Sequence, residues 1–136
     1  MHYVIYDGSC NLCVNLVKVL ERLDQGQRFR YIPMQDEATL ALLDVTPQTC
    51  QAGMIVIDKE NPQQRWQGSD AAEKIGQLLP LSQPAVAAYL AVPGLKAAGD
   101  RVYAQVRDNR YQIFGKRDQV YRSAYPAELR PTAAPD

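Results

Sequence analysis

The chain has 136 residues, a length typical of one domain built around a single core. Hydrophobic residues make up 46% of the chain and charged residues 22%, which excludes intrinsic disorder, collagen-like repeats and coiled coils. The 15 basic and 15 acidic residues balance, so the charge argues against nucleic acid as a partner.

The first third of the chain predicts a β-α-β unit. Residues 2–6 are rich in Tyr, Val and Ile and end at a polar turn, as expected for a buried strand. An amphipathic helix ending at Gly26 is indicated by apolar residues at spacings of three and four: Leu12, Leu16, Val19, Leu20 and Leu23. A second strand covers residues 29–32 and stops at Pro33. Two strands joined by a helix favour a right-handed parallel crossover.

The middle of the chain extends this unit. A short helix is predicted over residues 36–43, with Asp36 as its N-cap, and residues 54–57 are the most strand-like run of the chain. After a polar turn, residues 64–67 are short enough for a hairpin partner strand. A further helix opens at residues 68–70 and closes at Pro80. The order β-α-β-α-β-β-α predicts an α/β fold with a mixed sheet.

The last third of the chain predicts two more helices. Pro84 and Pro93 stand where first-turn prolines stand, and the second helix is expected to extend to about Phe114. Its apolar stripe is Leu95, Ala98, Val102, Val106 and Ile113. The expected organisation is a core over residues 1–80, a helical extension packed on it over residues 81–123, and a flexible tail over residues 124–136.

Charge is concentrated in the predicted extension. Between Lys96 and Arg122, seven residues are basic and three are acidic, which gives +4 there and −4 over the remainder. This surface is either a solvated helix face or a docking surface for an acidic partner or membrane phosphates. Within it, Arg110 either pairs with an acidic residue of the core or binds an anionic substrate.

Cys10 and Cys13 form a C-x-x-C pair where the first strand gives way to the first helix. The unpaired N–H groups and the peptide dipoles at a helix start stabilise a thiolate, so we expect Cys10 to be the attacking thiol. Cys13 lies one turn further on; we expect it to be more shielded from water and to resolve the mixed disulfide. In a reducing compartment, such a pair is typical of redox or metal chemistry.

Two alternatives to redox chemistry concern the same cysteines. Both could be ordinary buried residues, or they could form half of a zinc site, which needs two further ligands. Only Cys50 and His2 are available as such ligands, unless two copies of the chain share the metal, and we therefore expect no metal. Cys50 is interpreted as a small buried thiol, the alternative being a third redox cysteine that exchanges with Cys10.

Asp7, Cys10 and Cys13 together have the spacing D-x-x-C-x-x-C after a strand that ends in Tyr6. This motif resembles the DCC family, which is named after it. The resemblance covers roughly residues 3 to 117 and includes YIPMQ at 31–35, MIVID at 54–58, GSDAA at 68–72 and N-R-Y-x-x-F-G at 109–115. It implies a thioredoxin-like fold and the activity of a thiol-disulfide oxidoreductase.

Asp7 has two interpretations as a site residue. It either accepts a proton from Cys13 during resolution, like the buried carboxylate of thioredoxins, or it accepts backbone N–H bonds in the turn at Gly8 and Ser9. Because an ionised carboxylate beside Cys10 would disfavour its thiolate, Asp7 would oppose the helix terminus there.

A thioredoxin-like sheet brings further residues to the edge where the cysteines lie. Its third strand runs antiparallel to the first and its fourth parallel, so the start of the third and the end of the fourth lie beside the C-x-x-C pair. Thioredoxins place a proline before the third strand, and Gly53 stands in about that position here, without the fixed turn. The residues expected around a substrate, with Gln35 and Gly68 beside them, are Gly8, Ser9, Asn11, Leu12, Met34, Gly53, Met54, Ser69 and Asp70.

The sequence therefore predicts a dithiol–disulfide oxidoreductase that needs no bound cofactor, because the cysteines carry the electrons. The expected substrate is a disulfide or thiol of a protein or small molecule, with a reductase or glutathione as electron partner. The alternative is a non-enzymatic binding module or redox sensor, with metal binding through the cysteine pair. No signal peptide is recognisable and the longest apolar run, residues 85–92, is too short to span a membrane, so a cytoplasmic location is expected.

Overall fold

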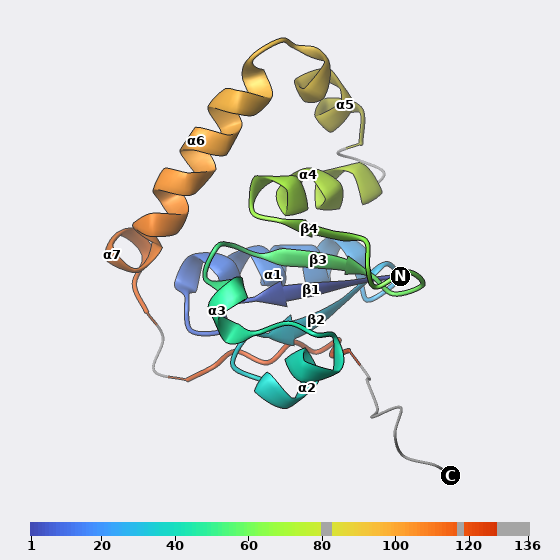
Figure 1. The fold of residues 1–136 in the computed structure, drawn as a ribbon, viewed down its shortest axis with the longest axis vertical. Coiled ribbons are helices and arrows are strands. Elements are labelled where there is room, and N and C mark those ends of the chain that lie inside the picture. The colour runs from blue at the N-terminus through green and yellow to red at the C-terminus, as the bar shows by residue number, and fades with distance from the viewer. Residues whose placement is uncertain (80–82, 117–118, 128–136) are drawn as a thin grey trace.

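A four-stranded mixed sheet lies at the centre of the fold, in the order β2-β1-β3-β4 (Figure 1). The computed structural model describes residues 1–79, 83–116 and 119–127. The strands are β1 (His2–Tyr6), β2 (Phe29–Pro33), β3 (Ile55–Asp58) and β4 (Arg65–Gln67). β2 is parallel to β1, β3 is antiparallel to β1, and β4 is antiparallel to β3. The predicted α/β fold and the predicted strand directions of a thioredoxin-like core are confirmed.

Helices cover both faces of the sheet. Successive side chains of a strand point to opposite faces, so each strand supplies apolar side chains to the helices on both sides. The four helices of the core are α1 (Asn11–Asp24), α2 (Glu37–Leu42), α3 (Pro47–Cys50) and α4 (Ser69–Leu78). Val4 and Tyr6 of β1 pack in one apolar cluster with residues of α1 and α4. Tyr3 and Ile5 pack in a second cluster, on the other face, with residues of α2 and α3.

The short helices begin at side-chain caps. Asp36 caps α2 as predicted, with its carboxylate accepting a hydrogen bond from the Thr39 N–H at 3.3 Å. α3 was not predicted, although Thr46 caps it by accepting from the Thr49 N–H at 3.2 Å and Pro47 stands in its first turn. A four-residue helix is too short to produce a periodic pattern, so only this cap signal was available in the sequence.

The apolar face that the sequence assigns to α1 is mostly wrong. Of its five positions only Leu20 is buried, whereas Leu16, Val19 and Leu23 are 40%, 50% and 56% exposed. The sheet is contacted by a different face, formed by Val14, Val17, Leu20, Glu21 and Asp24. Two acidic residues are tolerated there because the fold supplies hydrogen-bond donors for them.

Those donors come from the two segments beside the C-terminal half of α1. The Asp24 carboxylate accepts from the backbone N–H groups of Arg28 and Phe29 at 2.8 and 2.9 Å, at the corner that leads into β2. The Glu21 carboxylate accepts from the Tyr121 hydroxyl at 2.6 Å and from the Ala124 N–H at 3.3 Å. Acidic residues in an amphipathic pattern usually mark its solvent face, which is why periodicity misplaced the core side.

Beyond α4 the chain forms α5 (Gln83–Ala91), α6 (Leu95–Asp108) and α7 (Arg110–Phe114), which arch away from the sheet (Figure 1). The single helix predicted from Pro93 to Phe114 is therefore broken at Asn109. The part of its apolar stripe that lies in α6 does not enter the core, because no residue of α6 is buried and Val102 is 61% exposed. The side chain of Arg110 lies outside the described residues, as does the predicted tail from residue 128 onward.

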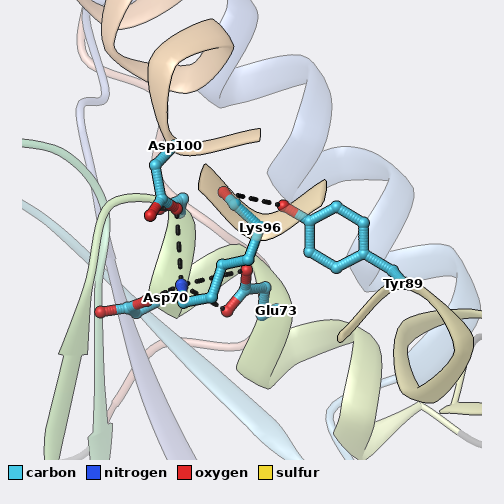
Figure 2. Close-up of polar contacts among 6 residues, drawn as sticks. Asp70, Glu73, Tyr89, Lys96 and Asp100 are labelled. Atoms are coloured by element: carbon cyan, nitrogen blue, oxygen red, sulfur yellow. Dashed lines mark hydrogen bonds and ion pairs between the residues drawn. The ribbon is translucent and has the colours of Figure 1, made fainter. Parts of the chain in front are cut away.

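Lys96 anchors α6 to α4 (Figure 2). Its ammonium donates to Asp70 at 2.6 Å and to Glu73 at 3.1 Å and is 3.4 Å from Asp100. The hydrogen bonds that it donates to Asp70 and Glu73 hold the pKa of Lys96 above its usual range. Part of the positive charge of the extension is thus paired with the acidic body. Docking of a partner on the remaining charge stays a prediction.

The described C-terminal residues return along the core. The Tyr121 N–H donates to the Gly8 carbonyl at 2.9 Å, and the Tyr31 N–H of β2 donates to the Tyr125 carbonyl at 3.0 Å. Residues 125–127, which the sequence places in an unpatterned tail, therefore pair with β2. In the part of the chain that the structure describes, no helix combines the length and apolarity needed to cross a bilayer.

Candidate functional site

The C-x-x-C pair lies at the end of β1 and the start of α1. Cys10 is the N-cap residue of α1, with extended backbone angles (φ −96°, ψ 122°), and Cys13 lies in the first turn. The turn before the helix is closed by the Cys10 N–H, which donates to the Asp7 carbonyl at 3.2 Å. All three cysteines are thiols. The predicted placement of the pair at a strand–turn–helix junction is confirmed.

The exposure of the two thiols is the reverse of the prediction. Cys10 is 0% exposed, whereas Cys13 is partly exposed. The cause is a contact remote in sequence, since Cys10 forms an antiparallel β-bridge with Lys116 and the Asn11 N–H donates to the Gly115 carbonyl. Sequence periodicity carries no information on a contact between segments so far apart.

Residues 111–116, which we call the C-terminal cover, therefore lie over the start of α1. The Asn11 side chain donates from Nδ2 to the Phe114 carbonyl at 2.8 Å. The Tyr111 hydroxyl donates to Oδ2 of Asp7. The Lys116 ammonium lies 5.5 Å from the centre of the Tyr111 ring, in a cation–π contact. The N-R-Y-x-x-F-G block is thus joined to the C-x-x-C motif in space.

Asp7 is buried, and its carboxylate is surrounded by donors. Oδ1 accepts from the Ser9 N–H at 2.9 Å and from Nε2 of Gln35 at 2.8 Å, while Oδ2 accepts from Tyr111. The bond from the Ser9 N–H is the one expected if Asp7 stabilises the turn at Gly8 and Ser9. Gln35 also accepts from the Gly8 N–H at 3.1 Å, so it holds the turn as well as the carboxylate.

The positions of Gln35 and Tyr111 beside Asp7 were not predicted from the sequence. The sequence places Gln35 only beside the residues expected around a substrate, and Tyr111 only in the N-R-Y-x-x-F-G block. Both lie in blocks that resemble the DCC family, and that resemblance was the one available signal. It marked the segments without showing that their side chains converge on Asp7.

An apolar pocket of about 80 Å³ opens beside Cys13. Its walls come from α1, α6, the start of β3 and the start of α4, and its lining residues are Leu12, Cys13, Leu16, Met54, Gly68, Ala72, Tyr103, Val106 and Arg107. Of the predicted substrate-contacting residues, this pocket brings Leu12 and Met54 together with Cys13.

Gly53 and Met54 lie under the second half of α6. The Met54 N–H donates to the Tyr103 hydroxyl at 3.3 Å. Gly53 has φ +130°, and a Cβ there would be 3.0 Å from both the Tyr103 hydroxyl and the Gly68 Cα. The backbone before β3, which was predicted to be open to a substrate, is therefore covered by Tyr103 from the extension.

The other predicted substrate-contacting residues have structural partners. Ser9 and Gly8 belong to the turn held by Gln35, and Asn11 binds the C-terminal cover. Ser69 donates to Asp100, and Asp70 binds Lys96. Met34 packs against the apolar cluster on the opposite face of the sheet. Their roles in binding a substrate stay predictions.

Cys50 is buried at the end of α3, in the second apolar cluster. Burial, and next the negative charge of Asp7, raise the pKa of the Cys50 thiol to about 11. Because the thiolate is the reactive form, this environment favours the interpretation of Cys50 as a bystander.

In a variant whose only cysteine is Cys50, we expect iodoacetamide to react at about neutral pH roughly 10²-fold more slowly than with a free thiol, whose pKa is about 8.5. The rate should climb with pH until about 11, where the native thiol loses its proton. Because the pKa of Cys50 is higher in the folded protein, its proton stabilises the folded state. This contribution to the free energy of unfolding is complete below the pKa of the unfolded chain and is lost as the pH rises through the pKa of the folded protein. In urea the same thiol should react as a free cysteine, and a fast native reaction at neutral pH would make Cys50 a redox candidate again.

A metal site at the cysteine pair finds no further ligands among the described residues. The one group there with three close metal-binding side chains is Asp70, Glu73 and Asp100, away from the cysteines. The Lys96 ammonium lies among these carboxylates, so they are already paired with a cation. His2 instead packs beside Trp66, with ring centres 5.9 Å apart.

Residues 4–116 match the family described as DCC1-like thiol-disulfide oxidoreductase. A chloroplastic DCC family protein of Arabidopsis thaliana is 31% identical over 115 residues, which are 85% of this chain and 66% of that protein. The chain thus spans slightly less than two thirds of the length of this relative. No solved structure matches the chain significantly. Since the matched residues include Asp7, both cysteines of the C-x-x-C pair and the cover over Cys10, the chain belongs to the DCC1-like thiol-disulfide oxidoreductase family.

Proposed function

We propose that this protein exchanges electrons with disulfide or thiol substrates through Cys10 and Cys13. The observation that carries the proposal is the position of Cys10 at the N-terminus of α1, with Cys13 one turn away. Backbone N–H groups and peptide dipoles at such a terminus favour a thiolate. The chain's membership of a thiol-disulfide oxidoreductase family supports a redox role in general.

The proposed reaction has two exchange steps. The Cys10 thiolate attacks one sulfur of the substrate disulfide, a new S–S bond forms, and the other substrate sulfur leaves as a thiolate that takes a proton from water. Cys13 then loses its proton and attacks Cys10 in the mixed disulfide, which forms the Cys10–Cys13 disulfide and releases the second substrate thiol. The substrate gains two electrons and the protein loses two. A thiol reductant, such as glutathione or a dithiol reductase, restores the pair.

Attack by Cys10 requires the C-terminal cover to move away, because Cys10 is completely buried beneath it. Besides the β-bridge at Lys116, the cover is held by the 3.3 Å bond from the Asn11 N–H, by the bond from the Asn11 side chain, and by the bond from the Tyr111 hydroxyl to Asp7. The bond from the Asn11 side chain is exposed to solvent, and hydrogen bonds of this kind open at low free-energy cost.

Removing one of these bonds is expected to speed up the attack. Asn11→Ala deletes the hydrogen bond to the Phe114 carbonyl, which is worth about 0.5–1.5 kcal/mol, so mixed-disulfide formation on Cys10 should accelerate roughly 2- to 10-fold. Stopped-flow kinetics in a Cys13→Ser background, where resolution is blocked, measures this step. Asn15→Ala, at an exposed position one turn later, is the matched control and should leave the rate unchanged. An unchanged rate in Asn11→Ala would mean that the cover does not limit access.

Replacing Asp7 separates its two proposed roles. Asn at position 7 retains a carbonyl oxygen for the Ser9 N–H but cannot accept a proton from Cys13. If Asp7 is the proton acceptor, Asp7→Asn should slow resolution by about 10²-fold while attack changes little. Rapid-quench trapping of the mixed disulfide and of the Cys10–Cys13 disulfide measures the two steps. Equal slowing of both steps would assign Asp7 a purely structural role.

A second function is favoured by the burial of Cys10, which would make the pair slow to react. In that case the protein would be a redox sensor or binding module rather than a turnover catalyst, and a metal held by the cysteine pair would be one form of it. A reducing compartment suits both functions, and we propose the cytoplasm. The name of the plant relative places that protein in the chloroplast.

The deciding experiment is a redox titration of the protein in glutathione buffers, followed by mass mapping and by turnover of a disulfide substrate with excess reductant. The proposal expects one Cys10–Cys13 disulfide and multiple turnovers. A disulfide that forms without turnover supports the sensor, and tight stoichiometric zinc supports the metal-binding module. No disulfide under oxidising conditions would overturn the redox function altogether.

A further inference from the structure

We infer that the pocket beside Cys13 receives an aliphatic side chain that neighbours the cysteine of a peptide or protein disulfide. This inference rests on the proposed function and names the substrate class of the same site. The substrate would be recognised by a side chain rather than by its thiol alone.

The pocket reaches Cys13, one of the two thiols of the proposed reaction. Cys13 forms part of its wall, together with Leu12 and Leu16 from the outward face of α1. A substrate joined to this cysteine pair by a disulfide must place its next groups within a few bond lengths of that wall. The side chain adjacent to the substrate cysteine is the group best placed to enter.

The opposite wall is supplied by α6 and is held in position. Tyr103 accepts from the Met54 N–H, and Arg107 donates from Nη1 to the Ala52 carbonyl at 3.0 Å. Val106, between them on the helix, completes the apolar lining. These contacts fix the width of the pocket, so it is a built site rather than a gap beside a loose helix.

The chemistry of the lining selects an uncharged, aliphatic group. The charged member of the lining is Arg107, whose guanidinium already donates to Ala52 and Asp108. Burying a charged or polar side chain here would leave it without partners, which costs free energy. The volume of about 80 Å³ is well below the ~150 Å³ of a cavity that binds benzene, so a branched aliphatic side chain fits better than an aromatic one.

Main-chain recognition by strand addition is blocked at the start of β3. The Met54 N–H, which an extended substrate would need as a donor, is taken by Tyr103. Tyr103 also lies over Gly53, where the backbone would otherwise be accessible. Specificity would therefore come from the side-chain pocket.

The test compares two short peptides that are identical except for the residue before a cysteine held in a mixed disulfide with glutathione. One peptide carries Leu at that position and the other carries Ser. Single-turnover release of peptide thiol by the reduced protein gives a rate constant for each. We expect the Leu peptide to react about 10-fold faster, the discrimination that one aliphatic group in an apolar pocket provides.

Matched variants assign that preference to the pocket. Val106→Asp, in the lining, should reduce the Leu/Ser ratio to about 1, whereas Val102→Asp, one turn earlier on the same helix and 61% exposed, should retain it. Leu16→Ser and its control Val19→Ser repeat the comparison on α1 and keep the test valid if Val106→Asp does not fold.

The outcomes distinguish the inference from the proposed function. Equal rates for both peptides, or a preference that survives both pocket variants, would overturn the inference while leaving thiol–disulfide exchange intact. Failure of both peptides to react would count against the proposed function itself. A faster Ser peptide would show that the pocket takes a polar group and would also overturn the inference.

Discussion

Cys13→Ser is expected to lower steady-state turnover of a disulfide substrate by at least about 10³-fold while leaving the first attack intact. The serine hydroxyl is not a nucleophile toward disulfides at neutral pH, so the mixed disulfide on Cys10 cannot be resolved and should accumulate. Intact-protein mass spectrometry after mixing with a glutathione disulfide should show one glutathione adduct per chain, located at Cys10.

The reciprocal variant assigns the roles of the two thiols. If Cys10 attacks, Cys10→Ser should form no adduct on the catalytic time scale, and Cys50→Ala should behave like the unaltered protein. An adduct that forms rapidly on Cys13 in Cys10→Ser would instead make the exposed thiol the attacking one. The structure gives this second outcome a physical basis, because Cys13 is partly exposed and Cys10 is not.

Asp24→Ala is expected to cost about 3 kcal/mol of the free energy of unfolding, the largest single effect on stability that we predict. Asp24 is 1% exposed, and its Oδ2 accepts from the N–H groups of Arg28 and Phe29. Alanine would leave both donors without a partner where α1 turns into β2, and each unsatisfied buried donor costs about 1–3 kcal/mol.

Urea denaturation measures this loss as a lower midpoint with an unchanged slope. Asp24→Asn is the matched control, because the amide oxygen can still accept from the backbone; it should lose about 1 kcal/mol. Asp36→Ala, which removes the cap of α2 and the bond from the Thr39 hydroxyl, should also lose about 1 kcal/mol. A loss for Asp24→Ala no larger than that for Asp36→Ala would mean that water replaces the carboxylate at this corner.

The strands and the position of the cysteine pair could be predicted because their signals are local. The Tyr-, Val- and Ile-rich run before Asp7 defines β1, and the helix that follows places Cys10 at an N-terminus. The order of elements then limits the sheet to few topologies, and the observed one follows from a parallel crossover between β1 and β2 and a hairpin between β3 and β4.

The errors concern contacts between distant segments. The core face of α1 depends on donors from Tyr121 and Ala124, and the burial of Cys10 depends on Lys116. An interpretation based on periodicity takes Leu16 and Leu23 as core residues, because it assumes that the apolar face of a helix is the face that packs on the sheet. In this fold, the outward leucines near Cys13 border a pocket whose other wall is α6.

The cover over the cysteine pair also sets an order of events during synthesis. Asn11 and Phe114 are 103 residues apart, while all four strands of the sheet lie before residue 68. At roughly 5–20 residues per second, the ribosome needs about 5–20 s to add the residues between them. During that interval the nascent sheet can form while Cys10 lacks its cover. A premature stop after α6 would leave the Cys10 thiol permanently without its cover. A truncation near the C-terminus would therefore be expected to expose Cys10, near the N-terminus, to oxidation.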